Sequence, residues 1–166
     1  MFVLGIDPGL SRTGYGVVEA SGTSIRAVAA GVIHTVPGDS VASRLHELYD
    51  DLEAVVVQFA PEEVAIEEVF VNRNLHTATS VARASGVAML AAARAGLSVF
   101  EYTPSAVKMA VAGYGDATKD QVQVMVARRL GLAGAPSPAD AADALAVALC
   151  HLQSAALRRA VEGAPP

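Results

Sequence analysis

The sequence predicts an α/β fold built on a five-stranded mixed sheet, with three antiparallel strands first, parallel strands after them, and helices on both faces. Three observations lead to this prediction. Three β-type runs follow one another near the N-terminus, and Gly22 lies in the short link between the second and third. From Val41 onward, apolar residues recur at helical spacing. Short strand-like runs then alternate with helical ones, as in parallel strands joined by crossovers.

The boundaries of the expected elements come from turn and capping residues. The first run is continuously apolar up to Asp7, which indicates a strand buried on both faces. Thr103 followed by Pro104 is typical of a helix start, and Thr118 with Gln121 has the spacing of a capping box. The expected strands cover residues 2–7, 13–20, 24–36, 63–69 and 97–102. The expected helices, caps included, cover residues 41–59, 72–96, 103–113, 118–131 and 137–159.

Length and composition favour one domain, residues 1–160, with a disordered tail at residues 161–166. The single cysteine, Cys150, excludes an internal disulfide. The N-terminus reads directly as a strand rather than as a basic leader, so we expect a cytoplasmic protein. No membrane partner is expected, because the most apolar stretch, residues 81–100, contains two arginines.

The net charge of −5 and a pI near 5.3 argue against an ordinary basic nucleic-acid-binding protein. This argument weakens if acidic residues gather around bound cations, which reverse the sign of the local field. The positions of the carboxylates therefore matter more than the total charge.

Four carboxylates stand where they are expected to meet. Asp7 and Glu67 each end a strand, and carboxyl ends of neighbouring parallel strands lie at one edge of a sheet. Asp140 and Asp143 are three residues apart at the start of the last helix, hence on one face. Such a set of oxygen ligands suits Mg²⁺ or Mn²⁺. Two such ions activate a water and stabilise the leaving oxygen in phosphodiester hydrolysis.

Each carboxylate also has a simpler interpretation. Asp7 before Pro8 and Gly9 is compatible with a turn, and Asp140 with a first-turn acid that favours the helix dipole. Asp143 and Glu67 are compatible with solvated surface positions. The residues alone indicate no more than metal-dependent phosphoryl chemistry.

Several motifs, in order along almost the whole chain, resemble those of the RuvC family of Holliday junction resolvases. They are Gly5-Ile6-Asp7-Pro8-Gly9, Thr13-Gly14-Tyr15-Gly16, Ala65-Ile66-Glu67-Glu68-Val69-Phe70, Val99-Phe100-Glu101-Tyr102 and Ala139-Asp140-Ala141-Ala142-Asp143-Ala144-Leu145-Ala146. The resemblance implies a ribonuclease H-like fold. It also implies a crossover junction endodeoxyribonuclease that resolves four-way DNA junctions in homologous recombination and repair, leaving 5′-phosphate and 3′-hydroxyl ends.

The resemblance also assigns roles to residues. It implies metal binding and catalysis by Asp7, Glu67, Asp140 and Asp143, with Mg²⁺, two ions to a site, and Mn²⁺ as a substitute; Glu68 has no assigned role. Lys119 is implied in catalysis as well as DNA binding. The implied DNA-binding residues are Phe70, Arg73, Lys108 and Lys119. The alternatives are a core position for Phe70 and solvated lysines.

The implied partners are four-way junction DNA, a second copy of the chain and the RuvA-RuvB branch migration complex. A homodimer supplies two sites for two opposed cuts. Its candidate interface is the helix at residues 72–96. The alternative interpretation is that this helix is buried completely within one domain. The small or apolar residues that suggest the interface are Ala78, Val81, Ala82, Ser85, Ala88, Met89 and Ala92.

The rival functions are a YqgF-type nuclease of the same fold, a non-catalytic DNA-binding scaffold and a member of the actin and sugar-kinase class. The last needs a second similar domain, for which 166 residues leave no room. Arg12 and Arg44 are weaker candidates for phosphate contacts. His34, His46, His76 and His151 have no metal-ligand spacing and are interpreted as surface or hydrogen-bonded residues, and Cys150 as a core residue.

Overall fold

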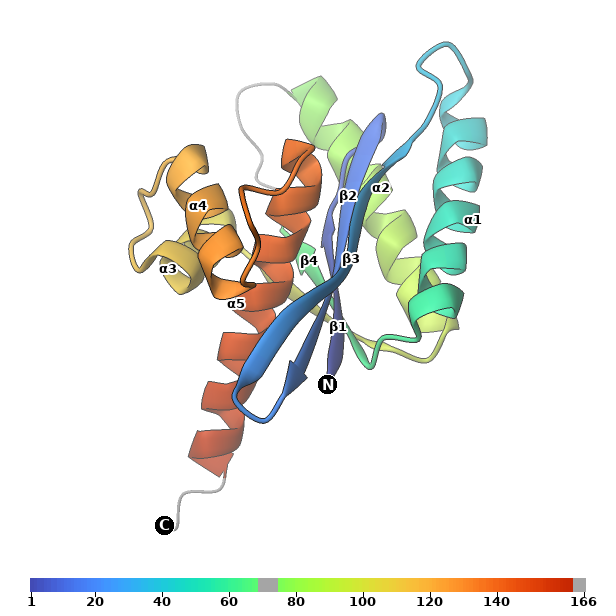
Figure 1. Cartoon of the computed structure of the whole chain (residues 1–166). Coiled ribbons are helices and arrows are strands. Elements are labelled where there is room, and N and C mark those ends of the chain that lie inside the picture. The colour runs from blue at the N-terminus through green and yellow to red at the C-terminus, as the bar shows by residue number, and fades with distance from the viewer. Residues whose placement is uncertain (69–74, 163–166) are drawn as a thin grey trace.

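A computed structural model of the chain describes residues 1–68 and 75–162, with side chains for 1–68 and 77–158, and contains a five-stranded sheet between two layers of helices (Figure 1). The strands are β1 (Phe2–Asp7), β2 (Arg12–Ser21), β3 (Ser24–His34), β4 (Glu63–Glu67) and β5 (Ser98–Tyr102). Their order in the sheet is β3-β2-β1-β4-β5. The first three pair antiparallel, whereas β4 is parallel to both β1 and β5. The predicted mixed sheet is confirmed.

Five helices cover the two faces of the sheet. They are α1 (Val41–Phe59), α2 (Leu75–Arg94), α3 (Pro104–Ala112), α4 (Lys119–Arg129) and α5 (Ala139–Glu162). Helices α1 and α2 lie on one face, and α5 lies on the other with α3 and α4 beside it (Figure 1). None of the helices within the two described ranges combines the length and apolar composition needed to cross a membrane.

The predicted boundaries differ from the observed ones at a few ends. Strand β3 ends at His34 rather than at residue 36, and Thr35 after it donates its backbone N–H to the Ser11 carbonyl oxygen (3.3 Å) and its hydroxyl to that of Leu10 (2.6 Å). Strand β4 ends at Glu67, and the predicted start of the following helix lies outside the described residues. Helix α5 continues to Glu162 rather than ending near residue 159.

Alternation along β1 divides the interior into two cores. Leu4 and Ile6 point into the core under α1 and α2, whereas Val3 points into the core under α5. All three are nearly inaccessible to solvent. Because Asp7 follows Val3 and Gly5 at a spacing of two, its side chain belongs to the α5 face.

Glycines on that face let α5 lie directly on the sheet backbone. A methyl group added at Gly5 would lie 2.1 Å from the carbonyl oxygen of Ala144, and one at Gly14 would lie 2.0 Å from that of Asp140. A methyl group at Gly16 would meet the backbone nitrogen of Leu145 at 2.8 Å. No larger residue fits at these positions without displacing the helix. We call Gly5, Gly14 and Gly16 the glycine trough.

The trough predicts that Gly5→Ala destabilises the fold strongly. Overpacking of a well-packed interior costs about 1–3 kcal/mol, and backbone contact places this case at the upper end. Urea unfolding followed by circular dichroism would measure the loss. The matched control is Gly38→Ala, where nothing lies within 4 Å of the added methyl group. Equal stability of the two variants would contradict the close contact of α5 with β1.

Candidate active site

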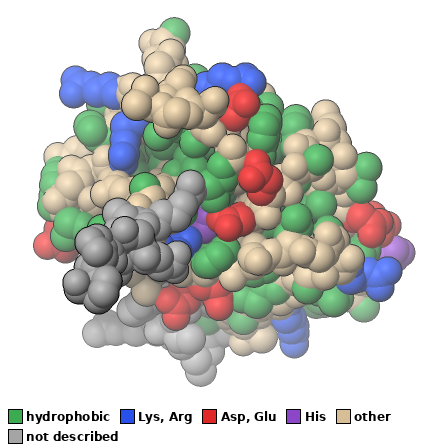
Figure 2. All heavy atoms as spheres, turned by 90° about the horizontal axis from the view of Figure 1, so that it is seen from below, with side chains coloured by type: hydrophobic (Ala, Val, Ile, Leu, Met, Phe, Trp, Pro, Cys, Tyr) green, Lys and Arg blue, Asp and Glu red, His purple; other side chains and the backbone are tan. Residues whose placement is uncertain are grey.

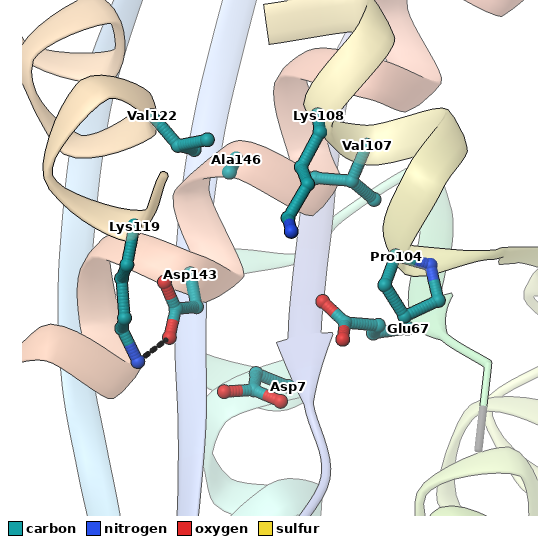
Figure 3. Close-up of a pocket in the computed structure, with 9 residues that line it drawn as sticks. All are labelled: Asp7, Glu67, Pro104, Val107, Lys108, Lys119, Val122, Asp143 and Ala146. Carbon is teal, nitrogen blue, oxygen red and sulfur yellow. Dashed lines mark ion pairs between the residues drawn. The ribbon is translucent and has the colours of Figure 1, made fainter. Parts of the chain in front are cut away.

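Asp7 and Glu67 end neighbouring parallel strands, as the sequence predicted. Ile6 is the register partner of Ile66, so the next residue on each strand, Asp7 and Glu67, leaves the sheet at the same edge. Both carboxylates point into one hollow between the sheet, α3 and α5 (Figure 3).

Asp143 enters the same hollow from the first turns of α5. The hollow is a cavity of about 230 Å³. The acidic lining residues are Asp7, Glu67 and Asp143, and the basic ones are Lys108 and Lys119. The apolar lining residues are Pro104, Val107, Val122 and Ala146. This apolar wall, which carries no signal in the sequence, shields part of the acidic site from water.

Lys119 is placed at the cavity by a helix cap. The Thr118 hydroxyl accepts from the Gln121 backbone N–H at 3.3 Å, and the Gln121 side chain accepts from the Thr118 backbone N–H at 2.9 Å. This predicted capping box makes Lys119 the first residue of α4. Its ammonium lies 2.6 Å from Asp143 Oδ2 (Figure 3). Lys108, on α3, points into the cavity from the opposite side (Figure 3).

Burial and the neighbouring carboxylates together disfavour the ionisation of Asp7. Burial is the main cause, and the nearby charges of Glu67, Asp143 and Asp140 add to it, so the pKa of Asp7 rises from 3.8 to about 7. Lys119 opposes the rise. The pKa of Asp7 therefore reports an excess of negative potential in a partly dehydrated place, which a bound cation would relieve.

The pKa values of Glu67 and Lys119, which also line the cavity, are raised as well. Burial and, after it, the charge of Asp143 raise the pKa of Glu67, against the opposing effect of Lys119 and Lys108. The hydrogen bond to Asp143 is the main cause of a raised pKa at Lys119. Lys119 thus remains a cation throughout the neutral range.

Asp140 takes a different position from the other three carboxylates. It does not line the cavity, and its Oδ2 accepts from Arg12 Nε at 2.8 Å and lies 2.6 Å from Arg12 Nη2. The sequence analysis assigned Arg12 only a weak phosphate-binding role and missed this pairing. The two residues are 128 positions apart and carry no local signal of contact.

The donor set fits a hard divalent cation, although the side chains are not gathered around one point. No three histidine, cysteine or acidic side chains within the described ranges are arranged so that they could hold a metal ion. Asp143 and Asp140 each direct an oxygen to a basic side chain instead. All four candidates offer carboxylate oxygens, the ligands preferred by Mg²⁺ and Mn²⁺. The raised pKa of Asp7 shows the repulsion that such an ion would remove.

The remaining residues predicted to contact DNA are Phe70, Arg73 and Arg44. Phe70 and Arg73 lie outside the described residues. Arg44 is buried and bonds to Thr35 and Ser11, so it is a structural residue rather than a phosphate contact.

His151 and Cys150 have structural surroundings, His34 is exposed, and the side chain of His76 lies outside the described residues. His151 is buried, with Nε2 at 2.5 Å from Glu63 Oε2 and Nδ1 at 2.9 Å from the Tyr102 hydroxyl oxygen. His46 is exposed beside Asp50. Cys150 is a core residue, as predicted, and burial raises the pKa of its thiol to about 11.

Charged side chains are interspersed on the face seen from below. Lysine and arginine side chains lie scattered there among acidic and hydrophobic ones, rather than in one basic patch (Figure 2). The described residues drawn on that face form no broad positive surface that would offset the net charge of −5. On this face, attraction of a polyanion would depend on local groups.

Comparisons with known proteins agree with this fold. The model of the family described as crossover junction endodeoxyribonuclease RuvC matches residues 3–151. The RuvC of Heliobacterium modesticaldum is 54% identical over 154 residues, covering 93% of this chain and 95% of that protein. The RuvC of Pelotomaculum thermopropionicum is 52% identical over 151 residues, covering 91% and 92%.

Solved structures give the same result. The Thermus thermophilus RuvC structure has a TM-score of 0.89 at 40% identity, with 95% of this chain and 97% of that chain covered. Thermus thermophilus RuvC in complex with a Holliday junction substrate has a TM-score of 0.90 at 40% identity, covering 95% and 96%. The chain therefore belongs to the crossover junction endodeoxyribonuclease RuvC family, and its fold is the predicted ribonuclease H-like one.

The raised pKa of Asp7 predicts that Asp7→Asn stabilises the metal-free protein. The folded state holds the Asp7 proton more tightly than the unfolded chain, so stability falls as pH rises from about 4 to about 7. Asparagine cannot ionise, so it removes this loss of unfolding free energy, which is on the order of 4 kcal/mol at most. Unfolding in EDTA should therefore show a gain for Asp7→Asn near pH 8 that vanishes near pH 4.

The exposed residue Asp51 supplies the control, because Asp51→Asn should leave stability nearly unchanged at both pH values. A destabilised Asp7→Asn protein at pH 8 would show that the carboxylate is held by favourable contacts instead of being repelled.

Proposed function

We propose that this protein is a metal-dependent endonuclease that resolves four-way DNA junctions in homologous recombination and repair. The observation that carries the proposal is the convergence of Asp7, Glu67 and Asp143 in one cavity with Lys108 and Lys119. Membership of a family described as crossover junction endodeoxyribonucleases, and the likeness to a relative in complex with a Holliday junction substrate, support it. The products are expected to carry 5′-phosphate and 3′-hydroxyl ends.

In this proposal Asp7, Glu67, Asp140 and Asp143 hold Mg²⁺, with two ions at the site and Mn²⁺ able to substitute. The bound cations supply a water of lowered pKa and neutralise charge on the phosphate. The carboxylates fix the donor positions, and the apolar wall of the cavity keeps their field from being screened by water. The raised pKa of Asp7 supports its place at the centre of the set.

In this proposal the basic residues of the cavity bind phosphates of the DNA. Lys119 is held by its cap and by Asp143, and we assign it to the scissile phosphate. Lys108, from the other wall, is assigned to a neighbouring phosphate. Arg73 is proposed as a further phosphate contact, and Phe70 as an aromatic that stacks on a base at the junction centre, worth roughly 1–3 kcal/mol. These two assignments rest on the resemblance of their motif.

The decisive experiment is cleavage of synthetic four-way junctions of varied sequence with Mg²⁺ or Mn²⁺. We expect paired nicks in opposed strands. Asp7→Asn should abolish cleavage but retain junction binding, since it weakens metal binding and also removes repulsion of the phosphates. Denaturing gels measure the cutting, and gel shifts in EDTA measure the binding. Folded wild-type protein that cuts no junction, or Asp7→Asn that cuts at the wild-type rate, would refute the proposal.

We further propose that the protein acts as a C2 homodimer, which offers two identical sites to the two opposed strands. The exposed face of α2 is the candidate interface. Of the residues first considered, Ser85, Ala88 and Ala92 are buried within the domain and do not belong to it. The exposed residues of this face include Ala82, Gly86, Leu90 and Ala93. A 54% exposed leucine among small residues allows close approach of a second helix.

The dimer proposal predicts that Leu90→Glu produces monomers. A carboxylate at the centre of an apolar interface is left without a partner, and its burial costs several kcal/mol. Sedimentation velocity at micromolar concentration distinguishes the two states. Val57→Glu on α1 is the control, because Val57 is also an exposed apolar residue and should leave the dimer intact. A wild-type monomer, both free and junction-bound, would remove the dimer from the proposal.

Three further parts of the proposal rest on the family. The protein is expected to act as one nuclease domain, residues 1–160, in the cytoplasm where its DNA substrate lies. A contact with the RuvA-RuvB branch migration complex would deliver junctions to it.

A further inference from the structure

Arg12 binds the one candidate ligand that does not face the cavity. Both bonds from its guanidinium end on the same oxygen, Oδ2 of Asp140. Arg12 is the first residue of β2, at the sheet edge where β1 ends in Asp7. The Arg12–Asp140 pair therefore lies at the rim of the site.

Close contact with the sheet fixes where the backbone of Asp140 lies. The Asp140 carbonyl oxygen lies against the position of Gly14, at the end of the glycine trough. A helix held in this way brings the Asp140 carboxylate either toward Arg12 or toward Asp7 and Asp143. Occupying Oδ2 with two N–H donors favours the first orientation.

We propose that Arg12 is a positioning residue that competes with the divalent cation for Asp140. This inference rests on the proposed function, since it takes Asp140 as a ligand. When a cation binds, Asp140 must exchange the guanidinium for the metal, and the site is complete only after that exchange. Arg12 thereby lowers the affinity of the free protein for metal.

The charges of the site support an exchange. Four carboxylates, namely Asp7, Glu67, Asp140 and Asp143, stand with three basic side chains, Arg12, Lys108 and Lys119. The protein's own cations thus nearly neutralise the site before any metal is bound. A divalent cation that enters would neutralise the carboxylates, and its repulsion would then push an exposed basic side chain outward. Arg12, whose side chain is 50% exposed, is free to leave.

The test is Mn²⁺ binding to the full chain, measured by electron paramagnetic resonance of the free ion and by calorimetry, without DNA. Arg12→Gln should bind Mn²⁺ about twofold to fivefold more tightly than wild type, the gain expected from removing an exposed ion pair. Arg12→Lys keeps the positive charge but loses the two N–H donors that bind Asp140 Oδ2. Its affinity for Mn²⁺ should therefore lie between those of wild type and Arg12→Gln. The matched control is Arg26→Gln, which breaks the Arg26–Glu19 ion pair between β3 and β2 and should leave affinity unchanged.

A second readout is the thermal midpoint. Addition of Mn²⁺ should raise the midpoint of Arg12→Gln more than that of wild type, because tighter binding to the folded state stabilises it more.

Each other result has a definite meaning. Equal affinity of Arg12→Gln and wild type would overturn the competition. Weaker binding by Arg12→Gln would also overturn it, because Arg12 would then orient Asp140 for the metal. A wild-type protein that binds no Mn²⁺ at all would instead refute the metal site of the proposed function.

Discussion

The direct contact of α5 with the sheet backbone is the constraint on which the rest of the structure depends. Side chains normally separate a helix from a sheet, but Gly5, Gly14 and Gly16 leave no such layer. The acidic residues of the first turns of α5 consequently come within electrostatic reach of Asp7. With a larger residue in the trough, Asp140 and Asp143 would stand farther from the ends of β1 and β4, and no common site would form.

This closeness has an electrostatic cost that the chain partly offsets. Burial and like charges make ionised Asp7 unfavourable, and Lys119 and Arg12 each neutralise one aspartate of α5. The neutralising groups come from different elements, one from a helix start and one from a strand start. The fold therefore keeps a site of high negative potential stable while leaving both cations near enough to the surface to be exchanged.

Most of the fold could be predicted because its signals are local. Apolar runs, helical spacing and the cap at Thr118 each lie within a few residues of one another, and the strands and helices they predicted are present. Asp7 and Glu67 could be placed together because parallel strands end at one edge of a sheet.

What could not be predicted depends on contacts between distant parts of the chain. Nothing near Arg12 shows that it meets Asp140, and nothing near Arg44 shows that it is buried. The glycines were visible in the sequence, but their purpose becomes clear only when α5 lies on them. The division of α2 into a buried and an exposed face likewise required knowing which way the helix is turned.

A trough of glycines has one mechanical consequence, which concerns the position of α5 along its own axis. The three glycines set how near the helix lies to the sheet, but they carry no side chains that could fix its position along the axis. His151 lies a little more than two turns beyond Asp143 on α5, about 12 Å along the axis. It is clamped between Glu63 of β4 and Tyr102 of β5. These polar contacts hold the helix along its axis, so the placement of the acidic residues also depends on a buried histidine farther along α5.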